Sequence, residues 1–256
     1  MITDELYQDG GVYISKHATA RFGAFEKDYL GIRAKEKRVF NIEEIRKLPQ
    51  VSADSPHASE WKMRAGSIDR FIRYLKKRKP VTIIDIGCGN GFFSNIISTY
   101  ANNVYGVDVN LLELQQAAVA FEANPKLQWY YLDIFSEYAF EEDTIDLITF
   151  CCSFQYFTEV EALIHKCSSL LKPGGSIHII DTPFYPKQDL ERARKATAQY
   201  YHNLGFDTLA QHYFHHSIEQ IKAFDPIIHY QPNRNFFSSL FRKNDSPFPW
   251  IEIRKQ

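Results

Sequence analysis

The sequence has no long apolar run. None of its 256 residues belongs to a stretch approaching the ~18 consecutive apolar residues that a membrane-spanning helix requires. The opening residues, MITDELYQDGG, have neither the basic region nor the apolar region of a secretory signal. We therefore expect a cytoplasmic protein without stable insertion into a membrane.

The chain also has no excess of charge of either sign. Its 30 Lys and Arg residues face 31 Asp and Glu residues, which gives a net charge of −1. Proteins that bind the nucleic-acid backbone normally carry a basic face, so this composition predicts no nucleic-acid partner. The 45% of hydrophobic and 15% of aromatic residues are enough to fill the core of one large α/β domain.

Spacings typical of metal and disulfide sites are missing too. His212, His215 and His216 lie close together in the sequence, yet no carboxylate stands at ligand spacing among them. We predict no metal site. The cysteines form no C-x-x-C pair, which argues against structural zinc and against a disulfide framework. They are Cys88, Cys151, Cys152 and Cys167.

What the sequence does contain is a glycine-rich turn. Residues 83–93 read IIDIGCGNGFF, in which a β-branched run and Asp85 precede three alternating glycines. This pattern predicts a strand, a tight turn and the start of a helix, because glycine admits positive φ and lets backbone N–H groups approach a ligand. A dinucleotide fingerprint would need its third glycine where Phe92 stands, so the pattern disfavours a pyrophosphate ligand.

Further strands and helices alternate along the chain. Apolar residues repeat with a helical period from Ser59 to Lys79 and again after Thr158. Strands that alternate with helices predict an α/β fold with a doubly wound, mostly parallel sheet. Two final strands without a helix between them predict an antiparallel hairpin at the C-terminal edge. The predicted strands after the turn are 103–109, 127–135, 146–154, 176–181, 226–230 and 250–254.

The N-terminal segment differs from the rest. Residues 1–57 contain short aromatic and charged pieces without one sustained period. We predict that they form a helical appendage or lid, and that residues 58–256 form the main domain. Tyr13, Phe22 and Phe25 are available from this segment to cover a pocket in the main domain.

The glycine turn resembles the first motif of class I S-adenosylmethionine (SAM)-dependent methyltransferases, in which an acid stands two residues before G-x-G-x-G, as Asp85 does here. Three further marks follow in order. Asp108 ends the second strand, Asp133 ends the third strand within LDIF, and LKPGG at 171–175 precedes the fifth. The resemblance covers roughly residues 80–181 and implies a seven-stranded sheet that binds SAM.

The cofactor contacts follow from this resemblance. An acid at the end of the second strand can accept hydrogen bonds from both ribose hydroxyls, which assigns that role to Asp108. The resemblance implies that Asp133 accepts from the adenine amine. Arg64 can reach the cofactor carboxylate with its planar guanidinium. The predicted cofactor-binding residues are Arg64, Asp85, Gly87, Cys88, Gly89, Asp108, Val109, Asp133, Ile134 and Ser153.

The stretch CCSFQYF at 151–157 bears on the acceptor. It lacks the N-P-P-Y type sequence of enzymes that methylate nucleobase amines. It is more similar to the corresponding stretch of small-molecule methyltransferases of the menaquinone and ubiquinone biosynthesis type. We therefore expect a small-molecule or lipid-like acceptor. Its predicted contacts are Gln155, Tyr156, Phe184 and Tyr185.

The catalytic groups are less well defined. A nucleophilic cysteine would need a lowered thiol pKa and a polynucleotide groove, and the sequence shows neither. Cys151 and Cys152 are expected to be buried strand residues instead. The candidate general bases, among which only geometry can choose, are Asp181, Tyr185, His202, His215 and His216.

Besides a methyltransferase, the sequence leaves two other functions open. One is a SAM-binding protein without catalysis, and the other is a nicotinamide-dependent oxidoreductase. It also leaves open the identity of the acceptor, the atom that is methylated, the need for a general base and the oligomeric state.

Overall fold

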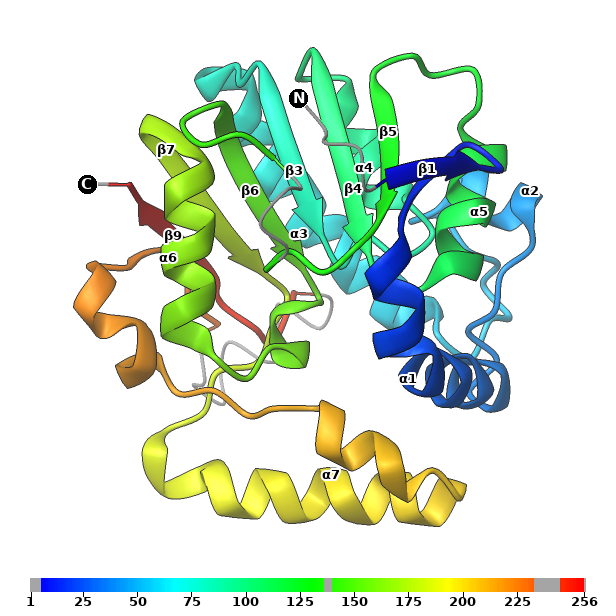
Figure 1. Cartoon of the computed structure of the whole chain (residues 1–256). Coiled ribbons are helices and arrows are strands. Elements are labelled where there is room, and N and C mark those ends of the chain that lie inside the picture. The colour runs from blue at the N-terminus through cyan, green and yellow to red at the C-terminus, as the bar shows by residue number, and fades with distance from the viewer. Residues whose placement is uncertain (1–5, 136–139, 233–244, 256) are drawn as a thin grey trace.

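A mixed sheet of nine strands runs through the centre of the described chain, which comprises residues 6–135, 140–232 and 245–255. In this computed structural model the strand order is β1-β2-β5-β4-β3-β6-β7-β9-β8, with helices on both faces (Figure 1). The strands are β1 Leu6–Asp9, β2 Val12–Ser15, β3 Thr82–Ile86, β4 Asn103–Asp108, β5 Leu127–Tyr131, β6 Ile145–Cys151, β7 Leu171–Ile180, β8 Ile227–Tyr230 and β9 Trp250–Arg254.

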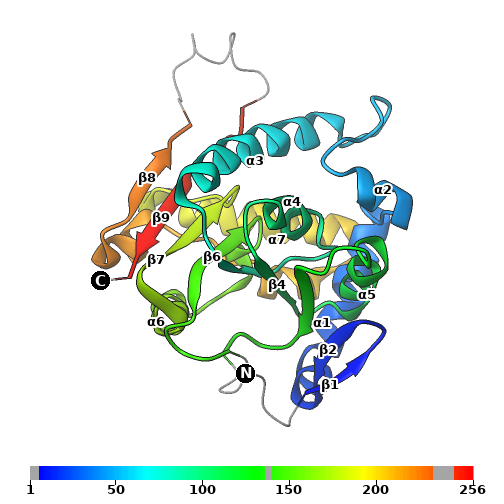
Figure 2. The ribbon, with the colours of Figure 1, turned by 90° about the horizontal axis from the view of Figure 1, so that it is seen from above.

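The helices divide between the two faces and one edge of the sheet. Seen from above, α3, α4 and α5 lie on one face and α6 lies on the other (Figure 2). α1 and α7 lie beyond the carboxyl ends of the central strands, toward which the arrowheads point in Figure 1. The helices are α1 Lys16–Lys35, α2 Ile42–Lys47, α3 Ala58–Arg78, α4 Phe92–Ser98, α5 Leu111–Ala120, α6 Val160–Leu170 and α7 Leu190–Leu204, with short 3-10 turns η1 Phe154–Tyr156, η2 Lys187–Asp189, η3 Asp207–His212 and η4 Ile218–Phe224.

The central strands are parallel, as the sequence predicts. β3 pairs with β4 and with β6, β4 pairs with β5, and β6 pairs with β7. β9 pairs antiparallel with both β7 and β8, which confirms the C-terminal hairpin at the sheet edge. The carboxyl ends of the parallel strands therefore meet along one edge, where open α/β sheets bind their ligands.

The prediction of seven strands was wrong, because the N-terminal segment adds two more. β1 pairs antiparallel with β2, and β2 pairs parallel with β5. The segment was expected to be helical, and it contains this strand pair as well as α1 and α2. Each of the two strands is four residues long, which is too short for an alternating pattern to stand out in the sequence.

Two element boundaries illustrate how burial and pairing set the ends. The helix predicted over 59–79 is α3, which ends where Lys79 takes up a left-handed conformation. The strand predicted at 176–181 begins earlier, because Leu171 pairs with Ile145 before a shift in register. The LKPGG segment is thus the irregular start of β7.

The N-terminal strand pair packs into the main core. Val12 and Ile14 are 0% and 1% exposed, and Ile45 of α2 is fully buried. They share one apolar cluster with Phe71 of α3 and Tyr131 of β5. A domain boundary between residues 57 and 58 stays a prediction, and chain on both sides of that point contributes to the same core.

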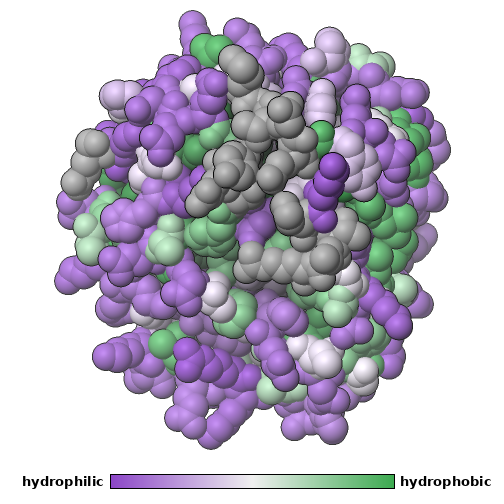
Figure 3. Space-filling model, in the orientation of Figure 1, coloured by the Kyte–Doolittle hydropathy of each residue, from purple (hydrophilic) through white to green (hydrophobic). Residues whose placement is uncertain are grey.

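Hydrophilic residues cover most of the coloured part of the face seen in Figure 3. Within the described ranges, no helix combines the length and the apolar character that a membrane span requires.

Replacing Ile14 by alanine should lower the free energy of unfolding by about 2–5 kcal/mol, the usual cost of truncating a buried isoleucine. Tyr7→Ala on β1 is the control, since Tyr7 is 47% exposed, and it should cost about 1 kcal/mol or less. Urea unfolding followed by circular dichroism measures both. Equally small losses would show that the strand pair does not belong to the core.

Candidate functional site

A tight turn joins β3 to α4 at the carboxyl edge of the sheet. Gly87 and Gly91 both have positive φ, at 72° and 73°. A β-carbon on Gly87 would stand 2.3 Å from Cβ of Ser153, and one on Gly91 would stand 2.4 Å from the ring of Trp129. These distances are far below van der Waals contact, so only glycine fits. The backbone of the turn therefore lies directly against β5 and the loop after β6.

Two adjoining cavities open at this turn. The larger has a volume of about 940 Å³ and the smaller about 470 Å³. The larger cavity is enclosed by parts of α1, α3 and α7, whereas the smaller lies at the ends of β4 and β5. One ligand bound across the turn can thus reach into both. The residues that line both cavities are Phe25, Tyr29, Gly87, Gly89, Cys152 and Tyr156.

Asp108 forms part of the wall of the smaller cavity. Its carboxylate accepts hydrogen bonds from the backbone N–H groups of Gly89 at 2.7 Å and Asn110 at 2.9 Å. These bonds fix it at the end of β4, and each oxygen retains a further acceptor position. Burial and the nearby charge of Glu113 raise the pKa of Asp108 to about 7. A ligand that donates hydrogen bonds to the charged form would stabilise that form.

Three other predicted residues line the smaller cavity as a strip beyond the ends of β4 and β5: Val109, Asp133 and Ile134. Asp133 accepts a hydrogen bond from the backbone N–H of Phe135 at 3.1 Å. Ser153 lies on the opposite side of the turn, and its hydroxyl donates to a backbone carbonyl of β3 at 2.5 Å. The smaller cavity thus combines strand-end carboxylates with an apolar wall.

Asp85 occupies a different position from the other predicted cofactor-binding residues. It is 1% exposed and lies outside the walls of both cavities. Its carboxylate accepts hydrogen bonds from the hydroxyls of Ser94 at 2.6 Å and Thr149 at 2.8 Å. Burial raises the pKa of Asp85 to about 6. The side chain is therefore placed to tie α4 and β6 to the base of the turn.

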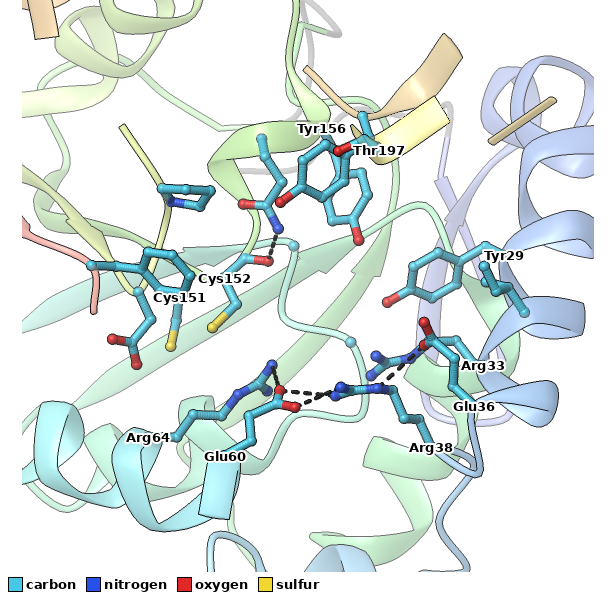
Figure 4. A pocket seen from close by; sticks show the side chains of 18 of the residues that line it. Tyr29, Arg33, Glu36, Arg38, Glu60, Arg64, Cys151, Cys152, Tyr156 and Thr197 are labelled. Carbon is cyan, nitrogen blue, oxygen red and sulfur yellow. Dashed lines mark hydrogen bonds and ion pairs between the residues drawn. The ribbon is translucent and has the colours of Figure 1, made fainter. Parts of the chain in front are cut away.

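Arg64 and Cys88 line the larger cavity beside the turn. The Arg64 guanidinium pairs with Glu60 at 2.8 Å and lies 4.9 Å from the ring centroid of Trp61. Figure 4 shows Arg64 on the same wall as Glu60, below the two adjacent cysteines. The predicted reach of Arg64 toward a ligand beside the glycine turn is compatible with this placement.

The acceptor contacts predicted from the sequence are partly brought together. Gln155, Tyr156 and Tyr185 line the larger cavity, and the Gln155 amide donates to the carbonyl of Cys152 at 2.6 Å. Phe184 is not part of either described wall, and its ring packs against Phe154 and His216 instead.

Among the candidate bases, Asp181 and Tyr185 reach the larger cavity. The described walls do not include the three histidines. His202 pairs with Asp207 at 2.8 Å on the surface, and His215 bonds the Thr197 hydroxyl at 2.9 Å. His216 is buried, which lowers its pKa to about 4.

Asp181 has an unusual environment at the end of β7. One carboxylate oxygen accepts from the hydroxyls of Ser67 at 2.7 Å and Ser246 at 2.6 Å. The other oxygen, Oδ2, is buried without a partner among the described residues. Burial raises the pKa of Asp181. Such a carboxyl group can take up a proton more readily than an exposed one.

Sequence reasoning missed the charged floor of the larger cavity. Arg38 holds Glu60 through two hydrogen bonds, at 2.8 Å and 2.5 Å, and pairs with Glu36 at 3.2 Å. Tyr29 and Arg33 stand one helical turn apart on α1, a spacing that indicates a shared face, yet the sequence does not say what that face meets. The missed residues drawn in Figure 4 are Tyr29, Arg33, Glu36, Arg38, Glu60 and Thr197.

Comparisons with known proteins agree with this geometry. Residues 84–179 match a family described as a methyltransferase domain. A ubiquinone biosynthesis O-methyltransferase of Cupriavidus pinatubonensis is 25% identical over 118 residues, which span 46% of this chain and 46% of that protein. Residues 84–179 thus form a methyltransferase domain. The chain spans about half the length, or less, of the curated relatives it matches first.

Solved structures with a similar fold include methyltransferases. The YcgJ protein of Bacillus subtilis is 15% identical, with a TM-score of 0.56 over 75% of this chain and 99% of that one. A SAM-dependent methyltransferase of Mesorhizobium loti is 18% identical, with a TM-score of 0.54 and the same two coverages. These likenesses establish the fold.

Gly87→Ala should destabilise the methyltransferase domain more than Gly174→Ala. Both glycines have positive φ, but a β-carbon at Gly174 would meet nothing within 4 Å. Alanine in this region of φ costs about 1–2 kcal/mol, and the clash with Ser153 should add about 1–3 kcal/mol for Gly87→Ala. Urea unfolding of the two variants measures the difference. Equal losses would contradict the close approach of the turn to Ser153.

Proposed function

We propose that this protein transfers a methyl group from SAM to a small-molecule or lipid-like acceptor. The observation that carries the proposal is the meeting of two cavities at the glycine turn. The smaller is lined by strand-end carboxylates, and the larger is lined by aromatic side chains. The adenosine part of a cofactor would lie in the smaller cavity, and its carboxylate end would extend into the larger one toward Arg64. An acceptor in the larger cavity would meet it beside Gly87 and Cys152, which line both.

The residues of the smaller cavity fit the adenosine part of SAM. The Asp108 carboxylate can still accept hydrogen bonds from the ribose hydroxyls. Asp133 and the backbone of Ile134 are the proposed hydrogen-bonding partners of the adenine ring. Arg64 is the proposed partner of the cofactor carboxylate, with Gly87, Cys88 and Gly89 forming the floor between. When bound, SAM supplies a methyl group on a positively charged sulfur. Asp85 supports this arrangement from beneath the turn.

The larger cavity suits an acceptor with an apolar or ring-shaped body. Tyr156 and Tyr185 stand on its wall beside aromatic residues of α1 and α7. A bound acceptor that fills this cavity would displace water from the reacting atoms and be held in line for transfer. If the nucleophile must lose a proton, Asp181 and Tyr185 are the candidate bases that reach this cavity, and Asp181 has the unpartnered oxygen.

The comparisons support a small-molecule acceptor, since the relative from Cupriavidus pinatubonensis is named for ubiquinone biosynthesis. The proposal keeps the expectations of a cytoplasmic protein that uses no metal and binds no nucleic acid. The balanced charge of 30 basic and 31 acidic residues supports the last of these.

SAM binding should weaken about tenfold when the pH falls from about 8 to about 6, because the Asp108 carboxylate has a pKa of about 7 and must be charged to accept both ribose hydroxyls. Isothermal titration calorimetry measures this dependence. Asp108→Asn should bind SAM about a hundredfold more weakly at pH 8 and lose most of the pH dependence. Unchanged affinity in this variant would contradict the ribose assignment.

The folding stability of the unliganded protein should depend on pH in the opposite direction to SAM binding. The pKa of Asp108 lies above its ordinary value of 3.8, so its protonation stabilises the unliganded fold. That contribution is complete below about pH 4 and is lost by about pH 7. The increase in folding stability that SAM produces should therefore be largest at neutral and higher pH, where the carboxylate is charged.

The enzyme should transfer label from methyl-labelled SAM into small molecules of a cell extract, as mass spectrometry would detect. Binding of SAM without any transfer would favour the non-catalytic alternative. Tighter binding of NADH than of SAM in calorimetry would favour the oxidoreductase. Asp181→Asn tests whether Asp181 acts as a general base. The variant should lower the transfer rate only if the acceptor must lose a proton.

A further inference from the structure

Arg33 on α1 faces the larger cavity without a partner. Within the described ranges no hydrogen bond or ion pair reaches its guanidinium, and its Nε atom is buried and unsatisfied. The nearest ring is that of Tyr29, whose centroid lies 5.5 Å from Cζ of Arg33. Leaving a buried charged donor without a partner is costly, so this position is suited to a ligand that supplies the acceptor atoms.

The other arginines beside it are already engaged. Arg38 holds both oxygens of Glu60 and pairs with Glu36. Arg64 also pairs with Glu60, at 2.8 Å. Glu60 is thus shared between these two arginines. Glu36 pairs with Arg38 and also accepts a hydrogen bond from the Tyr200 hydroxyl.

The charge of Arg33 is maintained where it stands. Burial acts to lower the pKa of Arg33, whereas the negative forms of Tyr29, Glu113, Tyr156 and Glu36 act to raise it, and the net direction is upward. None of these groups comes within ion-pair distance of the guanidinium. The side chain therefore presents a fixed positive charge and a planar set of donors to the cavity.

Arg33 lines only the larger cavity, as Arg64 does, whereas Tyr29, one turn earlier on α1, lines both. The two arginines stand on different helices, Arg33 on α1 and Arg64 on α3. With the cofactor carboxylate assigned to Arg64, Arg33 is left for the acceptor. In Figure 4 Arg33 and Tyr29 enter from one side, and Cys151 and Cys152 face them from the other. A group bound to Arg33 would thus lie in the larger cavity, beside the ring of Tyr29.

We propose that the acceptor carries a carboxylate on an aromatic body, and that Arg33 binds this carboxylate through its two-pronged guanidinium. This inference rests on the proposed function and names the acceptor class for the same site. Bidentate pairing of arginine with a carboxylate is strong and geometrically specific. The tyrosines of the larger cavity supply flat surfaces for the ring.

The test uses matched acids and neutral esters as probes on the full chain saturated with S-adenosylhomocysteine. 3,4-Dihydroxybenzoate and 4-hydroxyphenylacetate are each compared with their methyl esters by titration calorimetry. The acids should bind at least about tenfold more tightly, since a charge-assisted pair contributes that much. Arg33→Gln should bring the ratio of acid to ester affinity close to one, and Arg33→Lys should leave an intermediate ratio.

Arg46→Gln is the control, because Arg46 lies on α2 outside both cavities and pairs with Glu43. It should leave the ratio unchanged. Affinity for S-adenosylhomocysteine should be the same in wild type and Arg33→Gln, and lower in Arg64→Lys. Circular dichroism confirms folding, and Arg33→Lys serves if Arg33→Gln is unstable.

Two results would overturn the inference. One is wild-type affinity that does not favour the acids, including failure of every acid to bind. The other is an Arg33→Gln variant that loses affinity for S-adenosylhomocysteine while the acid-to-ester ratio persists, which would assign Arg33 to the cofactor. Absence of any S-adenosylhomocysteine binding in the wild type would instead count against the proposed function itself.

Discussion

The site depends on the contact between the glycine turn and the loop after β6. Gly87 lies so close to Ser153 that a β-carbon would stand 2.3 Å from its side chain. Beneath the turn, the Asp85 carboxylate binds Ser94 of α4 and Thr149 of β6. A buried carboxylate is tolerated there because both oxygens have hydroxyl donors. This arrangement fixes the backbone at the point where the two cavities meet.

The N-terminal strand pair sets the second boundary of the site. β2 pairs with β5, and α1 follows it directly, so the pairing delivers α1 to the carboxyl edge of the sheet. Tyr29 and Arg33 reach the cavities from that helix. α7 covers the same edge from the other part of the chain (Figure 1). The larger cavity is therefore assembled from segments far apart in the sequence around a shared sheet.

Charge is distributed unevenly between the two cavities. The smaller one contains Asp108 and Asp133, which suits a ligand rich in donors. The larger one contains a cluster in which Arg38 and Arg64 share Glu60, with Arg33 left unpaired. Because ion pairs in enclosed sites are weakly screened, these charges should act more strongly on a bound molecule than surface charges would.

The sequence by itself determined the central parallel strands, the glycine turn and the acid at the end of β4, because each is a local pattern within one βαβ unit. It predicted cofactor contacts for Asp108, Asp133 and Arg64 and left five candidate bases undivided. Only the tertiary structure put Asp181 and Tyr185 at the larger cavity. It left His202, His215 and His216 outside the described walls of both cavities. It also revealed β1 and β2, whose short strands have no clear period. The reason is sequence distance: the partners of Asp181 lie 114 and 65 residues away, and no local pattern encodes such contacts.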